Sequence, residues 1–230
     1  MIYHLSLEEI LNPQVLKEAI YDDLDHDYYW SEDFSDTFYI HLAKAGFISV
    51  ATIHEERSLL LPQIQTHYAI LEFHDLHISH HVKTLLKTPS RYSLRFNSAF
   101  KEVIVGIKES YEDCWIHEVY ENLLHTLYAK RYDDFKLLST ELFDTQTHTL
   151  VCGEIGYLCN NIYTGLTKFS LKDKAHKNWG TLQRVLLTQH LEKEGLAFCN
   201  LGHPQMEYKM DLGALVYDRH AFLKKCGLLA

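Results

Sequence analysis

Several features are scarce or absent in this chain of 230 residues, and each absence excludes a class of protein. No apolar run approaches the roughly 18 residues of a membrane helix, so we expect no membrane span. The first residues lack the basic start and long apolar core of a signal peptide. The five cysteines are an odd number and contain no Cys-x-x-Cys pair, which is typical of reduced thiols in a cytosol. We therefore expect a cytoplasmic protein.

Common catalytic motifs are missing as well. There is no Gly-x-Ser-x-Gly turn, no His-Glu-x-x-His zinc motif and no Walker-type phosphate loop. His74, His77 and His81 would share one face of a helix and could bind zinc, but we expect a polar helix surface there and no metal. The chain has no internal repeat or low-complexity linker, and its length suits one large domain or two small ones.

Positive charge is in short supply. The formal net charge is −9, and residues 1–60 hold 12 Asp and Glu against three Lys and Arg, whereas the remaining residues are balanced. A protein that grips a long stretch of nucleic acid normally presents a basic face. The charge balance therefore argues against extensive contact, and it leaves room for a small basic patch that touches one end of a nucleic acid.

The most informative segment that is present runs from residue 150 to 213. Two β-type runs, 150–158 and 162–170, flank Asn160-Asn161 and predict a hairpin. An amphipathic helix and a strand at 196–200 follow, which predicts a parallel strand pair joined by a right-handed crossover. Parallel strands commonly place a ligand at their carboxyl ends, so we expect the site at residues 168–170 and 200–203.

The other elements complete a mixed α/β or α+β chain. We expect a helix over 6–20, opened by Ser6 with Glu9 as a capping box, and a helix over 35–45 between Ser35 and Gly46. Residues 74–87 are predicted as a polar helix or turn. Further strands are expected at 47–53, 59–61, 67–73, 92–96 and 135–142, and further helices at 98–109 and 115–130. The chain is divided into a small N-terminal domain over 1–90 and a larger domain over 91–230.

Short sequence motifs along most of the chain, from Tyr28 onward, resemble those of a known family. They include Trp30-Ser31, Leu60-Leu61-Pro62, Trp115-Ile116, Gly153-Glu154-Ile155-Gly156-Tyr157, Tyr163-Thr164-Gly165 and Asn200-Leu201-Gly202-His203-Pro204. In order and spacing they resemble the leucyl/phenylalanyl-tRNA–protein transferases, and more closely a divergent subgroup related to them.

The resemblance implies a fold, a reaction and two partners. The larger domain is expected to have the GCN5-related N-acyltransferase fold, a mixed sheet with flanking helices, preceded by a smaller N-terminal α/β part. The reaction moves Leu or Phe from the 3′ end of an aminoacyl-tRNA to the α-amine of a protein or peptide, without a cofactor. The family's Gly-Glu-Ser is replaced here by Gly165-Leu166-Thr167, and its Asp-x-Gln by Asn200-Leu201-Gly202, so its catalytic carboxylate–amide pair is not preserved.

Three residues are candidates for catalysis. Histidine is suited to general base catalysis near neutral pH, so His203 would be the general base, aimed by Pro204. Asn200 would orient a carbonyl or an amine, and Glu154 would recognise a cationic group or act as a base. The alternatives are a loop histidine bonded to backbone, an asparagine that caps its turn, and a carboxylate that faces solvent.

The candidate binding residues fall into two groups. Aromatic side chains would stack on a terminal adenine or enclose an apolar aminoacyl group, with core packing as the alternative: Trp30, Trp115 and Tyr120. Tyr163 and Glu207 are also assigned to substrate binding. A lysine cluster after the hairpin would contact phosphates, or would be a solvated loop: Lys168, Lys172, Lys174 and Lys177.

The sequence thus predicts an aminoacyltransferase-like protein that uses aminoacyl-tRNA. One alternative is an acyltransferase of the same fold with an acyl-CoA donor, although residues 170–180 lack the Gly-rich loop that would hold its pyrophosphate. The other alternative is a binding or regulatory protein that retains the fold without the chemistry.

Overall fold

A seven-stranded mixed sheet forms the centre of the computed structural model, which describes residues 2–229. Its strand order is β11-β5-β10-β9-β8-β7-β6, and every neighbouring pair is antiparallel except β9 and β10. The strands are β5 (His67–Leu71), β6 (Tyr92–Phe96), β7 (Phe135–Asp144), β8 (Leu150–Cys159), β9 (Ile162–Ser170), β10 (Phe198–Asn200) and β11 (Leu215–Asp218). The predicted mixed α/β class is confirmed.

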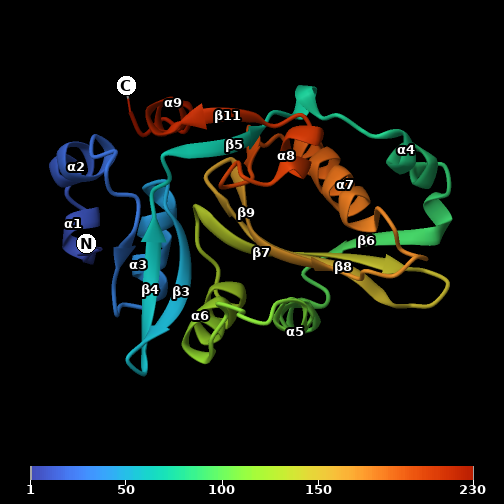
Figure 1. Cartoon of the computed structure of the whole chain (residues 1–230), viewed down its shortest axis with the longest axis horizontal. Coiled ribbons are helices and arrows are strands. Elements are labelled where there is room, and N and C mark those ends of the chain that lie inside the picture. Colours follow the sequence, from blue (N-terminus) through green and yellow to red (C-terminus); the bar gives the residue numbers. More distant parts are fainter. Residues whose placement is uncertain (1, 230) are drawn as a thin grey trace.

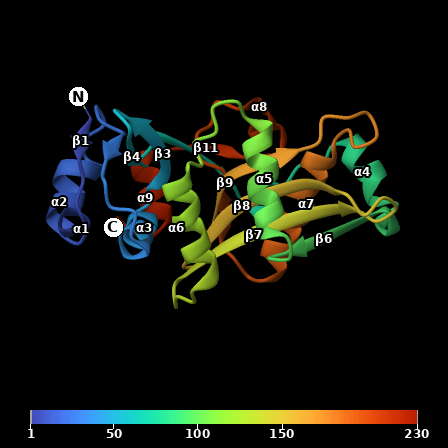
Figure 2. The same ribbon diagram turned by 90° about the horizontal axis from the view of Figure 1, so that it is seen from below.

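Helices cover both faces of this sheet (Figures 1 and 2). One side carries α5 (Phe100–Ser110) and α6 (Glu118–Ala129), and the other carries α4 (His80–Leu86), α7 (Trp179–Lys193) and α8 (Glu207–Asp211). The apolar residues of α5 recur at helical spacing, and Phe100, Val103 and Ile107 are all buried. Two buried clusters result, one on each face of the sheet.

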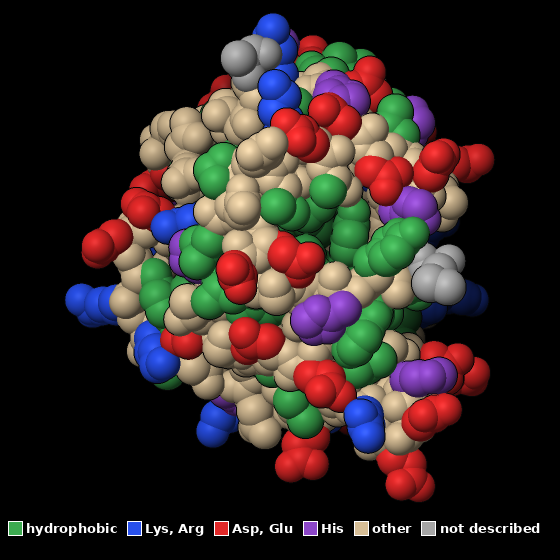
Figure 3. Space-filling model, turned by 90° about the vertical axis from the view of Figure 1, so that its left-hand side faces the viewer, with side chains coloured by type: hydrophobic (Ala, Val, Ile, Leu, Met, Phe, Trp, Pro, Cys, Tyr) green, Lys and Arg blue, Asp and Glu red, His purple; other side chains and the backbone are tan. Residues whose placement is uncertain are grey.

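The N-terminal part lies beside one end of the sheet (Figure 1). It contains a two-stranded parallel pair, an antiparallel hairpin and several helices. The elements are β1 (Tyr3–His4), α1 (Leu7–Ile10), α2 (Pro13–Val15), a π-helix (Leu16–Tyr21), β2 (Tyr29–Trp30), α3 (Asp36–Lys44), β3 (Ile48–His54) and β4 (Arg57–Gln63). Figure 3 views this end, where acidic side chains are spread over the surface and basic ones are few.

The predicted helix over residues 6–20 is interrupted in the structure. Ser6 and Glu9 do form the expected capping box, but α1 ends at Ile10. Asn12 then accepts hydrogen bonds from the next backbone N–H groups, and Pro13 begins α2. Proline has no N–H and is suited to a first helical position, so this dipeptide ends one helix and starts another. The predicted α3 is confirmed, with Ser35 as its N-cap.

The expected division at residue 90 stays a prediction. β5 precedes that residue, yet it pairs with β10 on one side and β11 on the other. The sheet that carries the candidate site therefore includes a strand from the first 90 residues. The remaining elements are two short 3₁₀ helices (Phe73–Asp75 and Pro89–Arg91) and α9 (Arg219–Lys225).

Replacing Arg219 with Met is expected to lower the free energy of unfolding by about 2–3 kcal/mol. Its guanidinium is fully buried and donates to backbone carbonyls only, those of Ile20, Asp23, His26, Ile64 and Gln65. These bonds tie α9 to the N-terminal part, and their loss leaves several buried carbonyls unpaired. Urea unfolding measures the change. The control is Arg57→Met on an exposed pair, which should change stability by less than about 0.5 kcal/mol; equal effects at both positions would contradict the prediction.

Candidate functional site

The site is built on the parallel strands β9 and β10, which separate after three residue pairs. Phe198 to Asn200 pair with Ile162 to Thr164, and from there to Ser170 the edge of β9 that faced β10 has no partner strand. On its other edge β9 carries a bulge, because Leu166 has no partner between the pairs of Gly165 and Thr167 with β8. Bulges often lie beside active sites, where they change the direction of a strand. The predicted parallel pair is confirmed.

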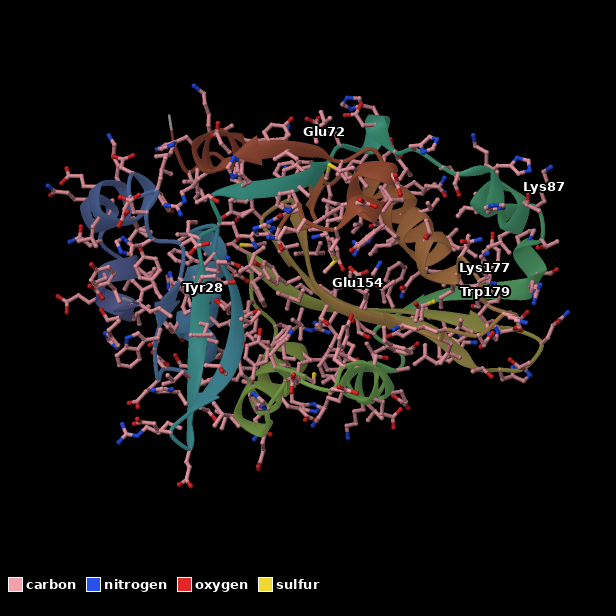
Figure 4. The ribbon with its side chains drawn as sticks, in the orientation of Figure 1. Tyr28, Glu72, Lys87, Glu154, Lys177 and Trp179 are labelled. Atoms are coloured by element: carbon pink, nitrogen blue, oxygen red, sulfur yellow. The ribbon has the colours of Figure 1, made fainter. Side chains whose placement is uncertain are left out.

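The separation opens onto a cavity of ≈ 430 Å³, which we call the central cavity. It is lined by Tyr111, Asp113, Trp115, Glu154, Gly165, Leu166, Thr167, Lys168, Arg184, Leu201, Met206, Tyr208 and Lys209. Part of the lining comes from the unpaired stretch of β9, and part from the loop after β10 and from α8. Figure 4 shows Glu154 near the middle of the molecule, beneath α7 and α8.

A buried ion pair forms part of the cavity lining. Glu154 and Arg184 are 1% and 4% exposed, and 2.6 Å separates Oε1 of the glutamate from Nη2 of the arginine. The hydroxyl of Tyr163 donates to the same Oε1 at 2.6 Å. A Cβ at Gly165 would lie 3.1 Å from that oxygen, so the glycine lets the pair lie close against β9. Tyr163 is fully buried and contributes by holding the carboxylate.

The ion pair leaves hydrogen-bonding capacity unused. Among the described residues, Oε2 of Glu154 and both Nε and Nη1 of Arg184 have no partner. Buried polar groups are normally hydrogen-bonded, so a group of this kind is expected to meet a ligand or water. The pair therefore offers one acceptor oxygen and two donor nitrogens next to the central cavity.

Two lysines add positive charge to the cavity. Lys168 lies over the ring of Tyr208, with 4.4 Å from Nζ to the ring centroid. Lys209 donates to the carbonyls of Leu201 and His203 at 2.5 and 2.6 Å, which ties α8 to the loop after β10. Burial, and then the charge of nearby Arg184, lower the pKa of each lysine to about 8. The lining of the cavity thus holds three cations, Arg184, Lys168 and Lys209, against the buried carboxylate of Glu154 and the exposed one of Asp113.

A second cavity of ≈ 490 Å³ lies at the predicted lysine cluster, and we call it the lysine groove. It is lined by Lys168, Ser170, Leu171, Lys172, Asp173, Lys174, His176, Lys177, Asn178, Gly180, Thr181 and Tyr208. Figure 4 shows Lys177 beside Trp179, at the start of α7. No side chain caps this helix, and Asn178, Gly180 and Thr181 at its start line the lysine groove, where the positive end of the helix dipole favours an anion.

Asp173, the one acidic residue in the lining of the lysine groove, is paired with a histidine and not with a lysine. Asp173 accepts from the backbone N–H of His176 at 2.9 Å and lies 2.8 Å from its Nδ1. The other ring nitrogen of His176 lies 3.2 Å from Asp144. Because the histidine bridges two carboxylates, the loop is fixed and the lysine charges remain available. The lysine groove and the central cavity share Lys168 and Tyr208.

The predicted catalytic residues do not meet in one place. Glu154 lines the central cavity, and it is buried, not solvent-facing. The side-chain oxygen of Asn200 accepts a hydrogen bond from the N–H of Gly202 at 2.9 Å. Asn200 lines a separate small cavity of ≈ 30 Å³. His203 accepts from the N–H of Gln205, and neither the central cavity nor the lysine groove includes it. Catalysis by Asn200 and His203 stays a prediction; their contacts hold the turn after β10.

The predicted binding residues are also divided. Trp115 lines the central cavity, and its ring lies 5.0 Å from that of Tyr120. Tyr120 is fully buried and donates to the carbonyl of Ser49, so it supports Trp115 from behind. Trp30 lines a different cavity with Ile53 and other residues of the β3–β4 hairpin. Glu207 is exposed at the start of α8 and lies outside both cavities described above.

Several residues of the cavity lining were not among the predicted site residues, and they include Tyr111, Asp113 and Arg184. The available signal was an arginine within the apolar stretch Leu182 to Leu187, where a charged side chain is rarely buried without a partner. The three histidines considered for zinc do not share one helix, because His74 lies in a 3₁₀ helix, His77 in the loop after it and His81 in α4. Within residues 2–229 no cluster of His, Cys, Asp or Glu is arranged to hold a metal.

The substitution Lys168→Met is expected to flatten the pH dependence of stability. With a pKa of about 8 when folded and 10.5 when unfolded, the lysine binds more protons in the unfolded chain between those values. Its destabilising effect is therefore fully present below pH 8 and is lost as the pH rises toward 10.5. The variant should exceed the parent in stability by roughly 1 kcal/mol or more at about pH 7.5 and by less at about pH 9.5.

Urea unfolding at the two pH values measures this difference, and subtraction of the parent curve removes the titration of buried tyrosines and cysteines. Lys101→Met, on an exposed helix face, is the control and should show no such change. A pH-independent difference for Lys168→Met would contradict the prediction.

Comparison with known proteins identifies one family. The family model described as leucyl/phenylalanyl-tRNA protein transferase matches residues 70–227, more than half of the chain. A search of curated proteins finds no match. Among the helices of residues 2–229, none combines the length and apolar character needed to cross a membrane.

Solved structures resemble this chain at low sequence identity. The structure of L-PGS from Bacillus licheniformis has a TM-score of 0.50 and 12% identity, over 94% of this chain and 76% of that one. A tandem GNAT protein from the clavulanic acid biosynthesis pathway has a TM-score of 0.43 and 13% identity, over 90% of this chain and 65% of that one. A functionally unknown protein from Staphylococcus epidermidis has a TM-score of 0.43 and 7% identity, over 94% and 79%. The first similarity supports a common fold.

Proposed function

Because this chain belongs to the leucyl/phenylalanyl-tRNA protein transferase family, we propose that it moves Leu, Phe or a similar aminoacyl group from aminoacyl-tRNA to the amine of a protein or another acceptor in the cytoplasm. The observation that supports the proposal is that the lysine groove and the central cavity lie next to each other and share Lys168 and Tyr208 in their linings. The donor has a phosphate-bearing end joined to an amino acid ester, and it needs two such spaces side by side.

The lysine groove would hold the phosphates of the tRNA 3′ end. Lys172, Lys174 and Lys177 supply charge on one side, and the uncapped start of α7 supplies backbone N–H groups. Trp115, held by Tyr120, offers an aromatic surface in the adjoining central cavity on which a terminal base would stack. A contact limited to one end of the nucleic acid also agrees with the net charge of −9.

Because the donor is an activated ester, the transfer mainly requires that the protein align the acceptor amine with the ester carbonyl. The acceptor nitrogen attacks the ester carbonyl carbon, so a C–N bond forms and the carbonyl oxygen becomes an oxyanion. The bond from this carbon to the ribose oxygen then breaks, and the ribose oxygen takes the proton that the amine releases. The edge of β9 that β10 leaves unpaired would donate N–H groups to the oxyanion. The free oxygen of Glu154 would bind a cationic amine of the substrate.

Transfer of labelled aminoacyl groups from a set of charged tRNAs to peptides tests this function. The set includes Leu- and Phe-tRNA, and the acceptors include a peptide that begins with Arg. We expect labelled peptide above a control without protein, and no product when acetyl-CoA replaces the charged tRNA. No transfer from any charged tRNA, or acetylation with acetyl-CoA, would remove the assignment.

A further inference from the structure

One part of the lining of the central cavity is unsuited to a purely apolar occupant. Its buried floor is made of Glu154 and Arg184, and Lys168 joins them from β9. An apolar side chain pressed against these groups would take water from the charges and return no hydrogen bond, which is unfavourable. The apolar part of the lining comes instead from β9, from the loop before α8 and from the segment before α6, and includes Leu166, Leu201, Met206 and Trp115.

The unused hydrogen-bonding groups define what would fit. Arg184 has two unpaired nitrogens, and Lys168 has no carboxylate partner among the salt bridges of the described residues. Lys209 adds a third positive charge through an ammonium that touches only carbonyls. Cations of this kind pair best with a carboxylate, because charge-assisted hydrogen bonds are the strongest. The free oxygen of Glu154, in contrast, needs a donor such as an ammonium.

We propose that the central cavity binds a substrate carboxylate on Arg184 and Lys168, next to an ammonium on Glu154, so that an acidic amino acid residue enters it. This inference rests on the proposed function and names its substrate class. A phosphate would suit the site less well, because the carboxylate of Glu154 repels a dianion and the lysine groove already serves phosphates. The acidic residue is either the aminoacyl group of the donor or the first residue of the acceptor.

Binding measurements that need no catalysis distinguish the two sources. The donor probes are 3′-deoxyadenosines that carry Asp, Asn, Glu, Gln or Leu on a 3′-amide, which cannot be transferred. The acceptor probes are peptides that begin with Asp, Asn, Glu or Gln. Titration calorimetry should give at least tenfold tighter binding for an acid than for its amide, in the donor series or in the acceptor series. The series that discriminates identifies the source.

Matched variants connect the discrimination to the cavity. Lys168→Met should reduce the preference for acid over amide to about twofold or less, whereas the exposed Lys101→Met should leave it unchanged. Because Arg184→Met alone leaves the buried carboxylate of Glu154 without its counter-charge, the paired change of Glu154 and Arg184 to Met is the second variant. It should bind the Leu probe in preference to the Asp probe.

The outcomes separate this inference from the function on which it rests. Equal binding of acids and amides, tighter binding of the Leu probe to the parent protein, or no binding of any probe would each overturn the carboxylate site. Transfer of Leu in the assay above would then still support the aminoacyltransferase. Acid-selective binding without transfer from any charged tRNA would retain the carboxylate site and remove the proposed reaction.

Discussion

Replacing Arg184 alone with Met should lower the free energy of unfolding by about 3–5 kcal/mol. The substitution leaves the carboxylate of Glu154 buried, at 1% exposure, with the hydroxyl of Tyr163 as its remaining partner. An uncompensated charge in the interior is among the most destabilising features that one substitution can create. Equilibrium unfolding in urea at neutral pH measures the loss.

The second half of this prediction concerns the pair. Replacing both Glu154 and Arg184 with Met, together with Tyr163→Phe to remove the orphaned hydroxyl, should restore stability to within about 1 kcal/mol of the parent. Long apolar side chains fill a similar volume and carry no desolvation cost. The control is the more exposed pair of Lys108 and Glu121, at 2.8 Å, whose two substitutions should couple by less than about 1 kcal/mol.

Additive losses from Glu154→Met and Arg184→Met would contradict this account, since they would mean that the two charges do not compensate each other. A restored apolar variant would carry a further consequence. If the protein is as stable without the pair, stability does not explain why two charged residues occupy the buried lining of the central cavity. Ligand recognition then remains as the reason for their presence.

The local parts of this fold were predictable from sequence. The hairpin of β8 and β9 depends on two neighbouring asparagines between β-rich runs, and the pairing of β9 with β10 follows from a strand, a helix and a strand in order. The lysine groove was predictable for the same reason, since its lysines follow one another within ten residues of chain. Each of these features is decided by residues that are close in sequence.

The parts that depend on distant pairing were not predictable. β11 consists of Leu215, Val216, Tyr217 and Asp218, three of which are exposed, and it is a strand because β5 lies beside it. Its short run has neither the alternation nor the turn residues that mark a strand. The position of β5 between β10 and β11 is likewise a tertiary result, and its pattern alone shows only a buried strand.

The candidate site shows the same division. Glu154 was identified as a candidate, but its alternation with Ile155 suggested that it faced solvent. It is buried because Arg184, thirty residues later, reaches it from α7, which covers that face of the sheet. One sequence cannot show which of its charges will pair. Asn200 and His203 were placed correctly at and just after the end of β10. The sequence could not show that both side chains would accept hydrogen bonds from backbone N–H groups of the same turn.

Replacing Lys172, Lys174 and Lys177 together with Gln should raise the KM for aminoacyl-tRNA by roughly 30–100-fold at about 0.15 M salt. All three are exposed in the lysine groove, and each is expected to neutralise one phosphate. Each lost contact removes the release of condensed counterions, so the slope of log affinity against log salt should fall by about 0.7 per phosphate, or about 2 in total. Binding at several salt concentrations measures the slope, and steady-state transfer measures KM.

A matched variant separates this specific effect from a loss of net charge. Gln at Lys17, Lys101 and Lys224 also removes three exposed lysines, and none of these lines either cavity. Both variants change the net charge equally, so a long-range attraction would affect them alike, whereas a phosphate site affects the first alone. Equal salt slopes for the two variants would show that the donor's phosphates lie elsewhere. A reduced slope in the first variant, with kcat nearly unchanged, would show that the lysines bind the donor at a distance from the ester that reacts.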